Sequence, residues 1–322
     1  MNPVLVEVTR GGRVESAHRG AFVVADADGA LMMQAGDIDA AIFPRSAVKA
    51  LQALPLVESG AADRLGLTEA EIALACSSHS GEPVHVATVL TMLAKAGRDV
   101  SCLECGAHWP YDAVAARALA AARAEPGPQH NNCSGKHAGF ICLACASGDG
   151  PAGYVRPDHP TMQRVTAALA EATGTTLDAR NRGTDGCSIP TYAIPLRALA
   201  RAFARFGTAD GAAARIRRAV AANPFMVGGT DRFDTVLMTA LGARAFTKGG
   251  AEGVHCAALP ELGLGIAIKC DDGAGRAADL VCATLVARLL DTDVPEVLLR
   301  PELRNWNGIA VGTVRAAGLL AT

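Results

Sequence analysis

The chain has 322 residues, half of them hydrophobic and 19% charged, and its formal net charge is -2. This length can bury a large core in one α/β domain. Because the basic residues are dispersed and only 4% of residues are aromatic, we expect no nucleic-acid partner. The sequence has no apolar run near the roughly 18 residues of a membrane span and does not open on a signal-like segment, so we expect no membrane partner and a cytoplasmic protein.

The N-terminal segment predicts an antiparallel sheet. Residues 4–10 alternate apolar and polar side chains, and Asp28-Gly29 separates two apolar runs, which is a strong hairpin signal. The following segment, PRSAVKALQALP, is typical of a short helix with a proline at its start and another past its end. Ser46 and Lys49 are therefore expected on one helical face.

The middle of the chain predicts helices. Thr68 and Glu71 form a capping-box pattern before an apolar helix that runs out into the turn SSHSG. Further helical patterns cover residues 83–97, 111–125, 135–147, 159–173, 194–206 and 212–222. Beyond them, GVHCAALP and GLGIAIKC flank Glu261-Leu262 as a second antiparallel pair, and RAADLVCATLVARLL predicts a closing helix.

This order of elements predicts one sheet built from both ends of the chain and covered by helices. We expect a single domain over residues 1–322, with a helical middle segment, about 60–240, inserted between the sheet-forming ends. We find no linker, internal repeat or low-complexity segment.

Lysine is rare in this chain: only five of the thirty basic residues are lysines. A desolvated lysine can lose its proton and act as a base, which arginine cannot do. Lys49 closes a Ser-x-x-Lys motif, Lys136 closes a Cys-x-x-Lys motif, and Lys248 opens a Lys-Gly-Gly motif. We therefore interpret Ser46 as a nucleophile that Lys49 activates. The alternative is a surface Ser/Lys pair without function.

The order of these motifs matches the penicillin-recognising serine enzymes, in which Ser-x-x-Lys precedes a serine turn and a Lys-x-Gly strand. Two departures stand against that assignment. The second motif reads Ser78-His79-Ser80 instead of Ser-x-Asn, and the third lacks the threonine of Lys-Thr-Gly. The expected export signal is also missing.

Cysteines suggest a metal site. In a cytosolic chain the ten cysteines are expected to be reduced, so each is a core residue, a ligand or a nucleophile. NNCSGKHAGF carries Cys133, and RGTDGCSIP carries Cys187. Two thiolates with one further donor can hold zinc with a water in the fourth position. Chemistry alone favours His137 over Lys136 as that donor. Buried cysteines that merely pack, or a separate Cys102-x-x-Cys105-x-x-His108 site, are the alternatives.

Together these segments resemble the rhizobial-type (class 3) L-asparaginases. The resemblance covers nearly the whole chain and rests on PRSAVKALQ, CSSHSGEP, CGAHWPY, NNCSGKHAGF, RGTDGCSIP, FTKGGAEG and GIAIKCDDG, in this order. It implies an α/β fold of the serine β-lactamase type, an α/β/α sandwich with a mainly antiparallel sheet. It further implies a homodimer, hydrolysis of L-asparagine to aspartate and ammonia, and one Zn2+ per chain held by two cysteines and a lysine.

The resemblance also implies roles for ten residues. The two Ser-Lys tandems are Ser46 with Lys49 and Ser78 with Lys248, the zinc ligands are Cys133, Lys136 and Cys187, and the substrate-binding groups are Arg45, His137 and Asp185. Lys269 competes with Lys248 for the second catalytic lysine. Two other functions stay open, namely a penicillin-recognising or esterase-type serine hydrolase and a non-catalytic zinc- or thiol-binding module.

Overall fold

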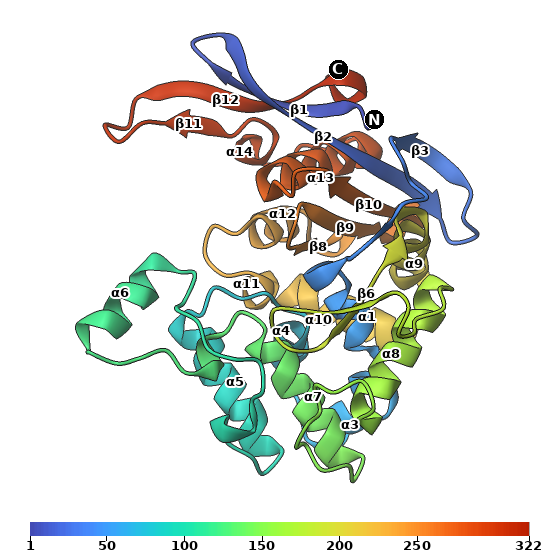
Figure 1. Cartoon of the computed structure of the whole chain (residues 1–322), viewed down its shortest axis with the longest axis vertical. Helices are drawn as coiled ribbons and strands as arrows, with labels where there is room; N and C mark the ends of the chain where they lie inside the picture. Colours follow the sequence, from blue (N-terminus) through green and yellow to red (C-terminus); the bar gives the residue numbers. More distant parts are fainter. Residues whose placement is uncertain (322) are drawn as a thin grey trace. The chain divides into compact units, whose positions relative to one another are not determined.

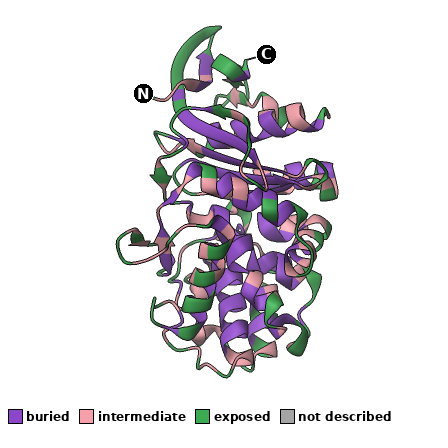
Figure 2. Cartoon of the chain, turned by 90° about the vertical axis from the view of Figure 1, so that its right-hand side faces the viewer, coloured by how far each residue is buried: buried purple, intermediate pink, exposed green. Residues whose placement is uncertain are grey.

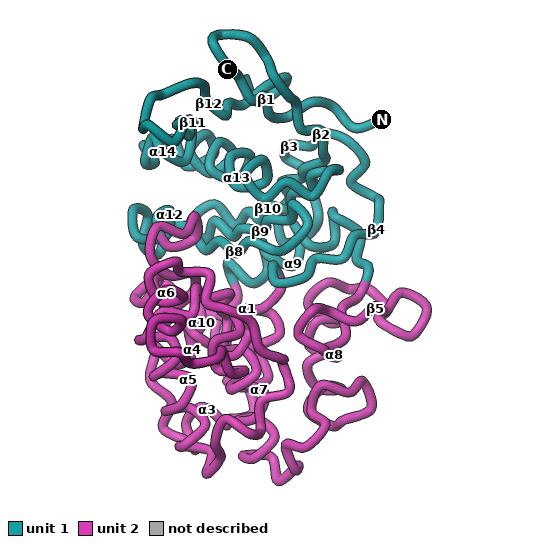
Figure 3. The backbone as a smooth tube through the Cα atoms, turned by 60° about the vertical axis from the view of Figure 1, so that its left-hand side comes forward, with its two compact units in different colours: residues 1–47, 193–208, 236–322 teal, residues 48–192, 209–235 magenta. Residues whose placement is uncertain are grey.

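The computed structural model describes residues 1–321, and the chain divides into two compact units (Figure 3). Unit 1 comprises Met1–Ala47, Ala193–Thr208 and Val236–Thr322. Unit 2 comprises Val48–Tyr192 and Ala209–Thr235. Within residues 1–321, no helix is both long and apolar enough to cross a membrane.

Unit 1 contains an antiparallel sheet of eight strands, in the order β11-β12-β1-β2-β10-β9-β8, with β3 also paired to β2 (Figure 1). The strands are β1 (Val4–Arg10), β2 (Arg13–Asp26), β3 (Leu31–Ala35), β8 (Phe246–Gly250), β9 (Val254–Leu259), β10 (Leu264–Cys270), β11 (Glu302–Arg304) and β12 (Ala310–Ala316). A separate short pair joins β4 (Ala41–Ile42) to β7 (Ile194–Pro195). The predicted sheet from both ends of the chain is thus confirmed.

Two helices cover opposite faces of this sheet. Gly207 of α9 (Leu196–Thr208) lies against Ala258 of β9, whereas His255, three residues earlier on β9, hydrogen-bonds to Asp279 of α13 (Gly275–Leu290). Alternate strand residues point to opposite faces, so unit 1 has α/β/α layers. The buried residues gather in the strands between these helices (Figure 2). Unit 1 also contains α14 (Glu296–Leu299) and most of α12 (Phe233–Leu241).

Unit 2 is mainly helical. Its helices are α1 (Lys49–Gln52), α2 (Leu54–Glu58), α3 (Ala61–Arg64), α4 (Glu69–Ala75), α5 (Pro83–Lys95), α6 (Ala113–Ala121), α7 (Ser134–Ala146), α8 (Pro160–Thr173), α10 (Ala212–Ala222) and α11 (Pro224–Val227). A hairpin of β5 (Arg182–Thr184) and β6 (Pro190–Tyr192) closes the list. In α7, eleven consecutive residues from Ser134 to Ala144 are buried, because neighbouring helices contact α7 on several sides.

The C-terminal strands β11 and β12 were not predicted. Gly312 explains part of this difference, because it weakens the strand signal of its own segment. A Cβ on Gly312 would lie 1.8 Å from the carbonyl oxygen of Thr9. The glycine therefore lets β12 approach β1, and a sequence pattern alone does not reveal such an approach.

Candidate active site

Lys49 is the most connected of the predicted catalytic residues in unit 2. It begins α1, and only 1% of its surface is exposed. Its Nζ atom lies 2.5 Å from the carbonyl oxygen of Ser77, 2.9 Å from Ser78 Oγ and 3.1 Å from Cys133 Sγ. One buried amine thus joins residues from three separate sequence motifs.

Three acceptors surround the Lys49 amine. Nζ donates to the carbonyl oxygen of Ser77, to Ser78 Oγ and to Cys133 Sγ. Loss of one proton would leave a lone pair on Nζ within reach of the Ser78 hydroxyl. Burial lowers the pKa of Lys49, against the opposing charge of Cys133 and with the help of the positive charge of Lys136.

Ser78 lies three residues beyond the end of α4, and main-chain hydrogen bonds fix its position. The predicted capping box is confirmed, because Thr68 Oγ1 accepts from Glu71 N and Glu71 accepts from Thr68 N. Beyond the end of α4, the Ser78 N–H donates to the carbonyl oxygen of Val227 at 2.9 Å, and the His79 N–H donates to that of Asn132 at 3.1 Å. The first bond ties the SSHSG turn to the end of α11, and the second ties it to the segment that precedes α7.

The start of α7 packs against the same turn. A Cβ on Gly135 would lie 2.4 Å from the carbonyl oxygen of Leu74 and 2.9 Å from Ser77 Oγ, so only glycine allows this approach. Cys133 is the residue before α7, and Lys136 is in its first turn. The close packing therefore brings both side chains to the turn that carries Ser78.

Cys133, Lys136 and Cys187 form a buried cluster with Lys49, which we call the thiol–amine cluster. Lys136 Nζ lies 3.0 Å from Cys187 Sγ. A hydrogen bond from Cys187 lowers the pKa of Cys133 well below its usual range, helped by the charges of both lysines. The same bond, with burial, raises the pKa of Cys187. Cys133 is therefore the more acidic thiol of the pair.

The pKa of Lys136 shifts in the opposite direction from that of Lys49. Burial alone would lower its pKa, but the charges of Cys187 and Cys133 outweigh that effect and raise it. Asp185 adds to this shift. Asp185 begins the turn between β5 and β6, where its N–H donates to the carbonyl oxygen of Ile189. The hairpin therefore presents Asp185 and Cys187 together to the thiol–amine cluster.

Unit 2 thus brings together seven of the ten predicted site residues: Lys49, Ser78, Cys133, Lys136, His137, Asp185 and Cys187. His137 is fully buried and follows Lys136 in the first turn of α7.

The other three predicted residues, Arg45, Ser46 and Lys248, lie in unit 1. Arg45 and Ser46 open the 3-10 turn η1 (Arg45–Val48), where Arg45 adopts a left-handed φ of 52°. Such a conformation is costly for a non-glycine residue and is concentrated at functional sites. Ser46 is only partly buried.

Lys248 lies on β8, an edge strand of the sheet. It is 2% exposed. Gly250, two residues later, shares its face of the strand, and a Cβ there would lie 2.5 Å from the carbonyl oxygen of Pro44. The face of β8 that carries Lys248 is thus the face that meets the segment before Ser46.

Its competitor Lys269, at the end of β10, has different contacts. Lys269 Nζ donates to the carbonyl oxygens of Glu252 and Cys270, both at 2.6 Å, and the residue is partly exposed. These contacts are typical of a lysine that satisfies main-chain carbonyls at a strand end.

The alternative site at Cys102, Cys105 and His108 is not assembled. Both ring nitrogens of His108 are occupied, since Nδ1 bonds to the carbonyl oxygen of Trp109 at 2.7 Å and Nε2 accepts from Asn132 N at 2.9 Å. Cys105 donates to the carbonyl oxygen of Pro128. Among residues 1–321, no three His, Cys, Asp or Glu side chains come together to hold a metal ion.

Sequence reasoning missed Asn131. Its side-chain amide donates to the carbonyl oxygens of Cys105 and Gly106, and its Oδ1 accepts from Cys133 N at 2.8 Å. It therefore fixes the main chain at Cys133. An asparagine three residues before a helix start is a turn-forming signal and could have revealed this role.

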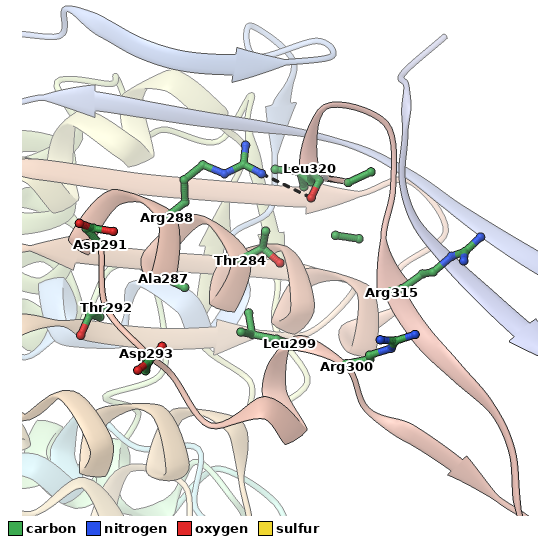
Figure 4. Close-up of a pocket in the computed structure, with 12 residues that line it drawn as sticks. Thr284, Ala287, Arg288, Asp291, Thr292, Asp293, Leu299, Arg300, Arg315 and Leu320 are labelled. Carbon is green, nitrogen blue, oxygen red and sulfur yellow. Dashed lines mark hydrogen bonds between the residues drawn. The ribbon is translucent and has the colours of Figure 1, made fainter.

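A pocket of about 770 Å³ lies elsewhere in unit 1, between α13, α14 and β12. Figure 4 shows Arg288, Arg300 and Arg315 around it, with Arg288 bonded to the main chain of Leu320. None of the ten predicted site residues lines this pocket.

Comparison with known proteins gives one family match. A family model described as L-asparaginase II matches residues 6–316. A search of curated proteins found no match. Among solved structures, a putative β-lactamase from Bacteroides dorei is 13% identical, covering 78% of this chain and 84% of its own, with a TM-score of 0.40. A β-lactamase from Mycobacterium bovis is 14% identical, covering 84% and 93%, with a TM-score of 0.34. At these scores the likenesses carry no argument about activity.

Proposed function

Because its family model spans residues 6–316, this chain belongs to the L-asparaginase II family, and we propose on that premise that it hydrolyses L-asparagine to L-aspartate and ammonia. The family supports asparaginase-type amidohydrolase chemistry. The observation that carries the finer proposal is the buried Lys49, whose lowered pKa and contact with Ser78 Oγ suit a base in serine catalysis.

In the proposed reaction, Ser46 is the nucleophile and Lys49 its base. The Ser46 hydroxyl gives its proton to Lys49 and attacks the carboxamide carbon of asparagine. The C–N bond then breaks, the proton passes to the leaving nitrogen, and ammonia departs from a β-aspartyl ester. Water hydrolyses the ester and releases aspartate. Ser78 and Lys248 form the companion tandem, and the hydrogen bond that Lys49 donates to Ser78 makes Ser78 a suitable proton relay.

Substrate recognition follows from the two charges of a free amino acid. A guanidinium can hold an α-carboxylate through a forked pair of hydrogen bonds, which is the role we assign to Arg45. A carboxylate accepts from an α-ammonium, which is the role we assign to Asp185. The left-handed φ of Arg45 supports its place in the site.

We also propose one Zn2+ per chain. Its ligands would be Cys133, Lys136 and Cys187, whose thiols and amine already lie in hydrogen-bonding contact and have the donor chemistry that zinc prefers. All three donors must lose their protons to bind it. When bound, zinc would act as a Lewis acid and would hold together the loops that carry these ligands. We propose that the enzyme is a homodimer, as the family resemblance implies, and that it is cytoplasmic.

Release of ammonia by the purified protein tests the proposed function. L-Asparagine is the substrate, with L-glutamine and a β-lactam as comparisons. Ammonia released from asparagine supports the proposal. Covalent capture of the β-lactam with no ammonia from asparagine would assign the chain to the penicillin-recognising hydrolases instead.

A further inference from the structure

Tyr154 is a buried tyrosine that none of the sequence motifs includes, and it contacts His137 directly. Both residues are fully buried in unit 2, and Tyr154 Oη lies 2.7 Å from His137 Nδ1. The two rings meet edge to face, with centroids 5.4 Å apart, and Phe140 packs against His137 at 5.9 Å. The His137 ring is therefore fixed in orientation.

Tyr154 is fixed as well. Its Oη atom accepts a hydrogen bond from the Glu104 N–H at 2.9 Å. In return, Glu104 Oε1 accepts from the Gly153 N–H at 2.6 Å. These two hydrogen bonds connect the loop that carries Tyr154 to the segment at Glu104.

The position of the hydroxyl hydrogen follows from these contacts. An amide N–H can only donate, so Tyr154 Oη is the acceptor toward Glu104. Its own hydrogen then has one partner in the described part of the chain, His137 Nδ1. Burial raises the pKa of Tyr154, so the hydroxyl keeps this hydrogen. His137 Nδ1 is thus an acceptor.

His137 must carry its single ring hydrogen on Nε2. Because Nδ1 accepts the Tyr154 hydrogen, it carries no hydrogen of its own. A neutral imidazole whose Nδ1 accepts has its hydrogen on Nε2. The Nε2 atom is buried and has no hydrogen-bond partner within residues 1–321. A buried donor of this kind calls for an acceptor.

We propose that Tyr154 is a positioning residue, which holds His137 as the Nε2–H tautomer so that His137 donates a hydrogen bond to an oxygen of the bound substrate. This inference rests on the proposed function for the identity of that substrate. Asparagine supplies two kinds of acceptor, the carboxamide oxygen and the α-carboxylate. His137 directly follows Lys136, a member of the thiol–amine cluster, at the start of α7.

A double-mutant cycle tests the kinetic part. Tyr154→Phe removes only the hydroxyl, and it should raise KM for L-asparagine on the order of tenfold, the usual effect of one hydrogen bond. In His137→Gln the side-chain amide donates without any tautomer to set, so adding Tyr154→Phe should change KM less than twofold. An equal loss in both backgrounds would show a merely structural role. Tyr192→Phe is the matched control, since Tyr192 is also buried and its hydroxyl bonds to Thr166.

Nitrogen NMR of histidine-labelled protein tests the tautomer without reference to activity. His137, identified by its loss in His137→Gln, should show one protonated and one unprotonated ring nitrogen in the wild type. Tyr154→Phe should shift or average these two signals, and Tyr192→Phe should leave them unchanged. A protonated Nδ1 in the wild type, or identical signals in Tyr154→Phe, would overturn the proposal. A protein that fails to hydrolyse asparagine but shows the expected tautomer would instead contradict the proposed substrate.

Discussion

Lys49 and Ser78, 29 residues apart in the sequence, share a buried hydrogen bond of 2.9 Å. The same Nζ atom contacts Cys133, which we assign to the zinc site. The predicted catalytic and metal motifs therefore meet at one amine. A substitution of Cys133 should therefore also change the pKa of Lys49.

Removal of either serine hydroxyl should abolish most of the activity. We expect Ser46→Ala to lower kcat by at least about 1,000-fold, because a nucleophile and its base act as a unit. Ser78→Ala should cost roughly 100-fold or more as the loss of a proton relay. The assay is ammonia release, with circular dichroism to verify folding. If Ser78→Ala is the more damaging variant and only Ser46→Ala still forms an acyl-enzyme, the nucleophile is Ser78.

The two candidate lysines of unit 1 should differ in their effect. Lys248→Ala should lower kcat/KM by roughly 100-fold or more, as the loss of a catalytic proton carrier. Lys269→Ala should change it by less than about threefold, because Lys269 only satisfies main-chain carbonyls. The reverse order of the two effects would move the catalytic role to β10.

Among the cysteines tested, only Cys133 and Cys187 should be needed for zinc binding. Cys133→Ser and Cys187→Ser should lose the single zinc per chain, since each removes a thiolate ligand. Cys102→Ser and Cys105→Ser are the controls and should keep it. Elemental analysis of each purified variant decides. Zinc retained without Cys133 and Cys187, or lost with Cys102, would contradict the assigned ligands.

Gly250→Ala should impair activity through the main chain near Ser46. The added Cβ would lie 2.5 Å from the carbonyl oxygen of Pro44, so the segment that carries Ser46 must move. A displacement of about 1 Å can cost roughly 100-fold in rate. Gly275→Ala is the matched control, because a Cβ there meets nothing within 4 Å. Equal kcat values for both variants would show that the contact is not needed.

The sequence predicted the sheet where local chemistry specifies it. Asp28-Gly29 does form a hairpin, in which Asp26 Oδ1 accepts from three successive N–H groups. The pair β9 and β10 also follows the pattern, because their apolar residues are buried on both faces. The strands β11 and β12 escaped prediction. The pairing of β12 with β1 depends on a close main-chain approach at Gly312 and not on an apolar pattern, and β11 pairs with β12 in turn.

The candidate site was predictable residue by residue but not in its contacts. Motif spacing indicated Lys49, Cys133 and Cys187 as chemical groups. Their arrangement depends on packing between distant segments, such as the approach of Gly135 to Ser77. Tyr154 carried no motif at all, and only its contact with His137 identifies it. Periodicity describes which face a residue occupies, and it cannot describe which distant residue it meets.

The central claim is that Lys49 acts as a neutral base, and ammonia release from L-asparagine by Lys49→Arg tests it most directly. Arginine keeps a positive charge but cannot accept the proton of a serine. We predict a loss of at least about 1,000-fold relative to the wild type, equal to that of Lys49→Met, with both variants folded by circular dichroism. Substantial activity in Lys49→Arg, with Lys49→Met inactive, would contradict the account, because Lys49 would then serve only as a positive charge.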